Sequence, residues 1–220
     1  MVAVFCLFVA MIMLGTARGL VRQSARWVSR APVGVTSRLM CDAAEGAEAA
    51  VPEWPLTELS RLEMRVGKIL EISKHPEADS LYVEKVDCGE ESGPRTIVSG
   101  LVKYCTEEDL LNREVVVLMN LKPRALKGIT SNGMLLCASS ADHSHVDPLA
   151  PPGGSSVGDQ ITFEGHKVAP MEAGNRASKA FSKVVADLFV DAEGRAMYKR
   201  VPFMTPHGAV TGSIAKGSIS

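Results

Sequence analysis

Residues 120–138 decide the fold prediction, and they read NLKPRALKGITSNGMLLCA. The strongly apolar run Val115 to Leu121 leads into this stretch, and the apolar run Met134 to Ala138 ends it. Both runs have the length and character of buried strands. The polar residues between them contain Pro123, which restricts the backbone, and glycines that allow tight turns. The stretch therefore predicts two strands joined by a stiff loop.

Alternating apolar and polar residues predict further strands on either side of this stretch. In chain order, the predicted elements are a strand over 62–72 with a bend or bulge at Gly67, strands over 81–86 and 95–98, a short helix over 106–111 with Thr106 as N-cap, the strands over 115–121 and 134–138, and a short closing strand over 161–163. Five main strands with one short helix between the third and the fourth match the connectivity of an all-β, five-stranded OB-fold barrel. Strand order alone leaves other small barrels open.

Composition excludes several classes of protein. The chain has 220 residues, 46% of them hydrophobic, which supports a packed core and excludes wholesale disorder. Its 24 basic and 25 acidic residues give a net charge of −1, which excludes a polycation that binds nucleic acid by bulk charge alone. The five cysteines contain no Cys-x-x-Cys pair, which argues against a zinc knuckle or a redox pair and favours buried, reduced thiols.

The N-terminus is predicted to be a targeting presequence. Residues 1–41 contain five arginines and no acid, whereas residues 42–220 hold all the acidic residues. Residues 1–17 have the apolar centre and small residues of a signal peptide, and the apolar run is shorter than the roughly 20 residues of a membrane span. Residues 18–41 are typical of a transit peptide. No membrane association is therefore expected of the mature protein.

The two signals in series resemble the bipartite presequence of proteins in complex plastids. A plastid location is therefore expected, with the mitochondrion as the alternative. A wrongly assigned start codon would instead mean that the leader has no targeting function. Residues 42–58 are rich in Ala, Glu and Pro and predict a linker, followed by the barrel over 59–164 and an extension over 165–220.

A local positive patch stands out in the loop between the two central strands. Lys122, Arg124 and Lys127 lie within six residues, and no acid occurs from 115 to 141. Lysine and arginine supply phosphate contacts, and polar side chains such as Asn120 and Ser131 can bind base or sugar edges. Met134 offers a polarisable surface on which a base could lie, although methionine at a strand start is as often core filler.

Several ordered motifs over residues 60–220 resemble the tRNA-binding domain family. They are Arg65-Val66-Gly67-Lys68-Ile69, His75-Pro76-Glu77-Ala78-Asp79-Ser80-Leu81-Tyr82, Val98-Ser99-Gly100-Leu101-Val102, Asn120-Leu121-Lys122-Pro123, Ser131-Asn132-Gly133-Met134 and Tyr198-Lys199-Arg200-Val201-Pro202-Phe203. This family is the OB-fold module appended to some methionyl- and tyrosyl-tRNA synthetases. It also occurs in the yeast cofactor Arc1p and in the auxiliary protein that yields endothelial-monocyte-activating polypeptide II.

The resemblance implies a tRNA-facing surface. Its expected residues are Asn120, Lys122, Arg124, Lys127, Ser131 and Met134, with Lys68, Ser99 and Gly100 on the same barrel face. Recognition is expected to use shape and backbone, with modest, salt-sensitive affinity. Ala125 and Asn132 depart from the family pattern.

The resemblance also implies that residues 165–220 pack on the barrel and imitate the dimer contact of shorter relatives, which predicts a monomer. No catalytic motif is present, and neither a cofactor nor a metal is expected. Asp142, His143, His145 and Asp147 are interpreted as a solvated loop. The favoured function is a non-catalytic tRNA-binding cofactor of an aminoacyl-tRNA synthetase. The alternative is a protein-binding module, cytokine-like or chaperone-like.

Overall fold

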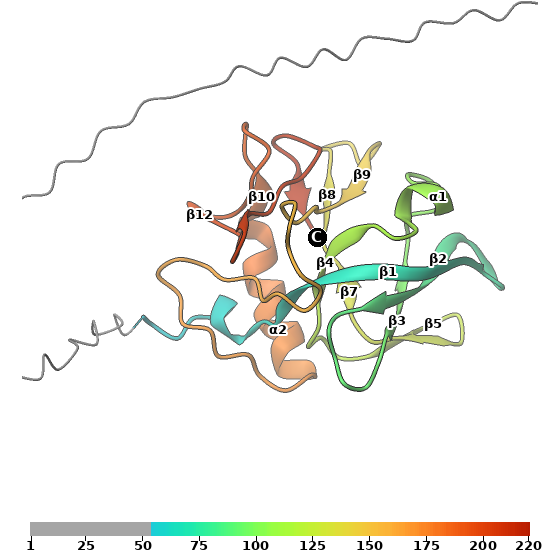
Figure 1. Ribbon diagram of the computed structural model, residues 1–220, viewed down its shortest axis with the longest axis horizontal. Helices are drawn as coiled ribbons and strands as arrows, with labels where there is room; N and C mark the ends of the chain where they lie inside the picture. Colours follow the sequence, from blue (N-terminus) through green and yellow to red (C-terminus); the bar gives the residue numbers. More distant parts are fainter. Residues whose placement is uncertain (1–53) are drawn as a thin grey trace, which may run out of the picture. The chain divides into compact units, whose positions relative to one another are not determined.

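Five antiparallel strands form the first sheet of the computed structural model, which describes residues 54–220 (Figure 1). The order is β3-β2-β1-β4-β7, with bounds β1 Met64–His75, β2 Ala78–Asp87, β3 Arg95–Ser99, β4 Glu114–Leu118 and β7 Met134–Leu135. The 3-10 turn η1, Leu59–Arg61, precedes β1. The mostly β architecture is confirmed. The predicted presequence and most of the predicted linker lie outside the described residues.

The predicted short helix is confirmed as α1, Glu107–Leu110, between β3 and β4. The Thr106 hydroxyl accepts a hydrogen bond from the Asp109 N–H at 3.3 Å, and the Asp109 carboxylate accepts one from the Thr106 N–H at 3.1 Å. This reciprocal capping box satisfies two backbone donors that the start of a helix leaves free.

The bulge that was one of the two irregularities predicted at Gly67 lies further along β1. The register between β1 and β2 shifts between Ile69 and Glu71, two residues later. Gly67 is required for close packing instead, because an added Cβ would lie 2.8 Å from Val86 Cγ1 and 2.9 Å from Val117 Cγ2. The glycine therefore lets β1 fit against side chains of both neighbouring strands.

The predicted strand over 134–138 is divided between two sheets. Its first part, β7, pairs with β4, and its second part, β8 (Cys137–Ser139), belongs to the second sheet. The closing strand expected over 161–163 is not formed as a strand. Only isolated bridges occur there, Arg65 with Gln160 and Thr162 with Met204.

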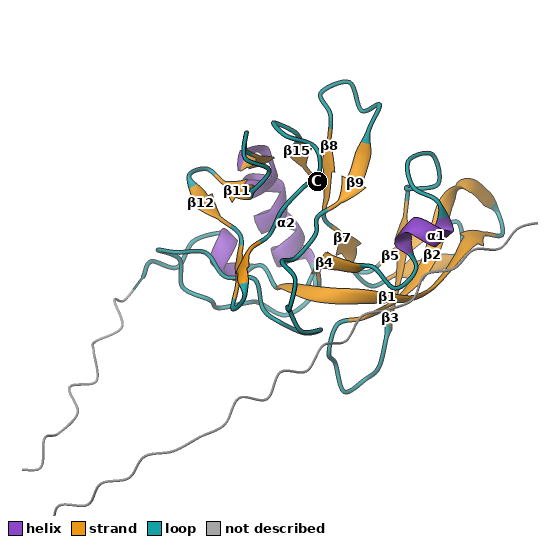
Figure 2. Cartoon of the chain, turned by 45° about the horizontal axis from the view of Figure 1, so that its top comes forward, coloured by secondary structure: helices purple, strands orange, loops and turns teal. Residues whose placement is uncertain are grey.

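The extension contributes most of the second sheet, which has the order β12-β11-β10-β15-β8-β9 (Figure 2). The further bounds are β9 Val146–Pro148, β10 Leu188–Val190, β11 Ala196–Tyr198, β12 Val201–Pro202 and β15 Ser218–Ile219. Two small hairpins, β5 Arg124–Leu126 with β6 Ile129–Ser131 and β13 Met204–Thr205 with β14 Gly208–Ala209, complete the strands. Because β15 pairs with β8, the extension continues a sheet that the barrel region begins.

The extension also supplies α2, Asn175–Val184, followed by the 3-10 turn η2, Val185–Asp187. This helix was not predicted, although the spacing of its apolar residues indicates one. Ala177, Ala180 and Val184 are buried and lie on one helical face. No described helix is both long and apolar enough to cross a membrane.

Two hydrophobic cores lie on opposite faces of the first sheet. Val66 and Leu118 belong to one core, whereas Ile69 and Val117 belong to the other. The first core is completed by the extension, where the buried Phe203 ring meets Phe163 edge-to-face at 4.7 Å. The expected packing of the extension on the barrel region is therefore present.

The three cysteines of the described region are buried and unpaired, as expected. Burial raises the pKa of the Cys88 thiol to about 12, so this group stays protonated at neutral pH.

Candidate nucleic-acid interface

The predicted cationic loop forms the β5–β6 hairpin, which lies beside β3 (Figure 1). Its two turn residues, Lys127 and Gly128, have φ angles of 47° and 88°. Positive φ at both positions is typical of a type I′ turn, whose twist matches that of paired strands. The turn presents Lys127 at the tip of the hairpin.

Arg95 on β3 holds both ends of the cationic segment. Its Nη1 atom donates to the carbonyl oxygens of Met119 at 2.7 Å and Asn132 at 2.8 Å. Glu90 pairs with the other side of the guanidinium, where Nη2 donates to Oε1 at 2.6 Å. This hydrogen bonding lowers the pKa of Glu90, so the partner stays ionised and Arg95 stays in place.

The tip of the hairpin has its own support from β1. The His75 side chain is 4% exposed, and its Nδ1 atom accepts a hydrogen bond from the Glu77 N–H at 3.0 Å. The proton of the neutral ring is therefore on Nε2, which donates to the Leu126 carbonyl at 3.2 Å. His75 was not among the predicted site residues.

Helix α2 and the residue before it support the N-terminal end of the cationic segment. The Lys122 N–H donates to Ser178 Oγ at 3.1 Å, and the Gly174 N–H donates to the Asn120 carbonyl at 3.1 Å. Leu121 and Gly174 form a parallel bridge. The extension thus positions the backbone from which the first predicted cation projects.

Asn120 does not face solvent, contrary to the prediction. Its side chain is buried, with Nδ2 donating to the carbonyls of Arg61 at 2.8 Å and Met171 at 3.0 Å. Its Oδ1 atom accepts from the Glu63 N–H at 3.1 Å. With every polar atom of the amide engaged inside the chain, Asn120 joins three segments rather than offering a contact.

Ser131 is likewise internal. Its Oγ atom accepts from the Val98 N–H at 2.9 Å and donates to the Gly133 carbonyl at 3.0 Å, and the residue is 5% exposed. The hydroxyl joins the hairpin to β3 and is not a surface group.

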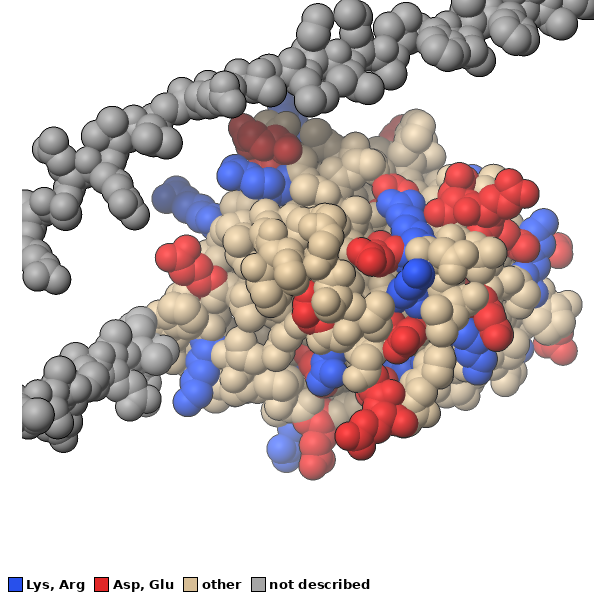
Figure 3. Space-filling view, viewed as in Figure 1, with Lys and Arg blue, Asp and Glu red and all other residues tan. Residues whose placement is uncertain are grey.

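The three predicted cations are exposed. Lys122, Arg124 and Lys127 all lie at the surface, and among residues 54–220 none of them comes within 4.0 Å of a carboxylate. Acidic side chains gather instead over α1 (Figure 3). The hairpin therefore offers unneutralised positive charge on a firmly held backbone.

The remaining predicted residues are not brought together on one face. Lys68 shares its face of β1 with Val66 and lies opposite Asp87 and Glu114 on the neighbouring strands. Ser99 lies on the opposite face of the sheet, and its hydroxyl donates to Glu84 Oε1 at 2.7 Å. The exposed Gly100 follows Ser99 directly. Met134 is half-buried and packs against the first core.

Glu84 was missed by the sequence analysis. Its side chain on β2 is fully buried, and Oε2 has no hydrogen-bond partner among residues 54–220. Burial raises the pKa of this carboxyl to about 7. The signal was present in the sequence, since Glu84 lies two residues from both Tyr82 and Val86 on one strand and therefore shares their inward face.

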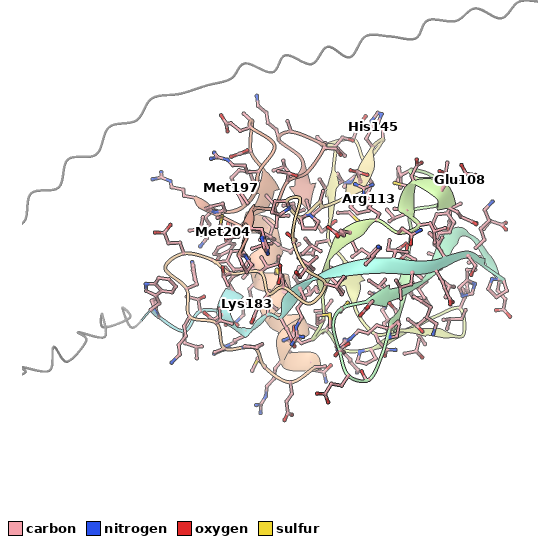
Figure 4. All side chains as sticks on the ribbon, in the orientation of Figure 1. Glu108, Arg113, His145, Lys183, Met197 and Met204 are labelled. Atoms are coloured by element: carbon pink, nitrogen blue, oxygen red, sulfur yellow. The ribbon has the colours of Figure 1, made fainter. Side chains whose placement is uncertain are left out.

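Helix α2 adds further cations beside the hairpin. Arg176, Lys179 and Lys183 are exposed, and the helix contains no acid. Lys183 lies beside η1 and pairs with Glu58 at 2.7 Å (Figure 4). Within the described region, Arg176 and Lys179 have no such partner. An open cleft of about 380 Å³ separates the helix from the hairpin.

Comparison with known proteins gives consistent matches. Residues 64–160 match the family model described as "Putative tRNA binding domain". The cytoplasmic tyrosine–tRNA ligase of Danio rerio is 48% identical over 160 residues, which are 72% of this chain and 30% of that protein. The aminoacyl tRNA synthase complex-interacting multifunctional protein 1 of Mus musculus is 45% identical over 159 residues, 72% of this chain and 50% of that protein. The chain thus spans half or less of these two relatives.

A solved structure matches over a complete chain. The crystal structure of the C-terminal domain of Plasmodium vivax p43 superimposes with a TM-score of 0.70 at 37% sequence identity. The match covers 75% of this chain and 100% of that domain. Its extent shows that both the barrel region and much of the extension have counterparts in a known protein.

Proposed function

The chain belongs to the tRNA-binding domain family, and on that premise we propose that it binds transfer RNA through the exposed cations of the β5–β6 hairpin. The observation that carries the proposal is the combination of three positive charges, unpaired within residues 54–220, with a backbone held at both ends and at the tip. A held loop loses little conformational entropy on binding, and lysine and arginine neutralise backbone phosphates.

The mode of recognition follows from the small size of the patch. Three cations on a body of negative net charge contact few phosphates, so the affinity is modest and falls with salt. Phosphate contacts carry no sequence information, so discrimination among tRNAs is weak.

We further propose that the protein is a non-catalytic cofactor of an aminoacyl-tRNA synthetase. Support comes from the relatives, since one is named as a tyrosine–tRNA ligase and another as a synthase complex-interacting protein. A bound tRNA would raise the local substrate concentration for such an enzyme. Co-purification of a synthetase activity with the full chain tests this role, and its absence in the presence of tRNA would contradict it.

We also propose that the protein acts in an organelle. This proposal rests on residues 1–41, which contain five arginines and no acid. A fluorescent fusion of residues 1–50 is expected to enter a plastid, or failing that a mitochondrion. Cytosolic fluorescence would contradict both locations.

We also propose that the mature protein is a monomer, because the extension packs against the first core. Light scattering of the mature protein is expected to give the mass of one chain. A mass near twice that value would contradict the idea that the extension replaces a second copy.

Binding itself is tested by filter titration with bulk tRNA. The double variant Lys122→Ala/Lys127→Ala is expected to bind tRNA about tenfold or more weakly than the native chain, since two phosphate contacts are lost. The matched control is Lys103→Ala/Lys167→Ala, which removes two exposed lysines outside the hairpin. Equal losses in both double variants would contradict the proposed site.

A further inference from the structure

The cleft between the β5–β6 hairpin and α2 has features that phosphate binding does not use. Its volume of about 380 Å³ falls in the range of about 300–1,000 Å³ that is typical of small-ligand sites. Apolar groups of Leu126, Met134 and Phe181 line it, and Lys122 and Arg124 stand on the same lining. An apolar cleft with cations at its side suits a ligand that is flat and apolar at one end and anionic at the other.

We propose that this cleft receives one unpaired nucleobase of the bound tRNA, with the phosphate of the same nucleotide on Lys122 or Arg124. The inference rests on the proposed tRNA-binding function and adds a base contact to it. Phe181 is half-buried against the first core, which fixes its ring at the edge of the cleft. Bases stack on aromatic rings, and methionine offers a polarisable surface for the same purpose.

Two serines of α2 also line the cleft, with different capacities. Ser178 Oγ accepts from the Lys122 N–H and donates to the Gly174 carbonyl at 3.2 Å, which leaves it one lone pair. Ser182 Oγ donates to the Ser178 carbonyl at 2.9 Å and keeps its lone pairs free. Ser182 can therefore accept a hydrogen bond from an exocyclic amino group or a ring N–H of the base.

The charge distribution favours a nucleotide over other occupants of an apolar cleft. Lys122 and Arg124 have no acidic partner within the described region. Helix α2 also carries the exposed Lys179, directly after Ser178 of the cleft lining. A base inside a duplex is stacked and paired, so only an unpaired nucleotide can enter. The cleft therefore distinguishes folded RNA with unpaired positions from continuous duplex.

The test fills the cleft without disturbing the core. Ser182 is exposed, so Ser182→Leu is expected to fold normally, and Ser156→Leu, another exposed serine, is the matched control. Since a stacked base contributes about 1–3 kcal/mol, Ser182→Leu is expected to weaken tRNA binding by about five- to 150-fold. The salt dependence of binding should stay close to that of the native chain, because Ser182→Leu keeps Lys122, Arg124 and every other cation.

A fully paired RNA duplex of similar length separates the outcomes. Its affinity is expected to be the same for Ser182→Leu, Ser156→Leu and the native chain. If Ser182→Leu leaves tRNA binding intact, or weakens tRNA and duplex equally, the base site is wrong, while an effect of Lys122→Ala/Lys127→Ala would still support the proposed function. If the native chain binds neither RNA, the proposed function itself fails.

Discussion

The backbone N–H of Lys122 donates a hydrogen bond to Ser178 Oγ at 3.1 Å, which joins the cationic segment of the barrel region to the helix of the extension. The two residues are 56 positions apart in the chain. The extension is therefore part of the support of the candidate interface, in addition to completing the first core.

Ser178→Ala tests this support. The change removes the acceptor of the Lys122 N–H, and it is expected to lower the free energy of unfolding by about 1 kcal/mol. Affinity for tRNA should fall a few-fold because the loop is less firmly held. Urea unfolding and filter binding measure the two effects. An unchanged affinity, at the expected loss of stability, would show that Lys122 does not need this anchor.

Asn120→Ala separates a structural role from a binding role. The variant leaves the Glu63 N–H and the carbonyls of Arg61 and Met171 without their partner, so the free energy of unfolding is expected to fall by about 3 kcal/mol. Denaturant unfolding measures the loss. Weaker tRNA binding at native stability would instead restore Asn120 as a direct contact.

Glu84 makes stability depend on pH. The folded-state pKa of Glu84, about 7, lies above the ordinary glutamate value of 4.5, so between these values the folded protein binds more protons than the unfolded one. The contribution is therefore fully present below pH 4.5 and is lost as pH rises through 7, by about 3 kcal/mol in total.

Glu84→Gln is expected to remove this dependence, because the amide stays neutral. Urea unfolding at pH 5 and pH 8 should show the variant more stable than the native chain at pH 8 by about 2 kcal/mol. Parallel pH profiles for the two proteins would mean that the carboxyl is not the titrating group.

Gly67→Ala tests the close packing of β1. The new Cβ would lie 2.8 Å from Val86 Cγ1, and the expected destabilisation is about 1–3 kcal/mol by thermal or urea unfolding. Gly153→Ala is the control, because no atom of the part of the chain that the structure describes lies within 4 Å of its added Cβ. Equal stability of the two variants would contradict the packing role.

Features set by neighbouring residues could be predicted from the sequence. The capping box of α1 needs only Thr106 and Asp109, and the first three strands, β1 to β3, follow from local alternation. The exposure of Lys122, Arg124 and Lys127 agrees with the loop prediction, because a short hairpin rich in cations has little to bury.

Features set by distant partners could not be predicted in the same way. Asn120 is a polar loop residue in the sequence, and its burial depends on carbonyls 59 and 51 positions away. The register shift after Ile69 depends on how β2 aligns with β1. Helix α2 is different, since the spacing of Ala177, Ala180 and Val184 could have revealed it.

The salt dependence of tRNA affinity tests the central claim most directly. Filter binding from low to moderate salt is expected to give a linear fall of the logarithm of affinity, with a slope shallower by about two for Lys122→Ala/Lys127→Ala than for the native chain. The control Lys103→Ala/Lys167→Ala should keep the native slope. An identical slope in the native chain and the hairpin variant would contradict the claim that these cations contact phosphates.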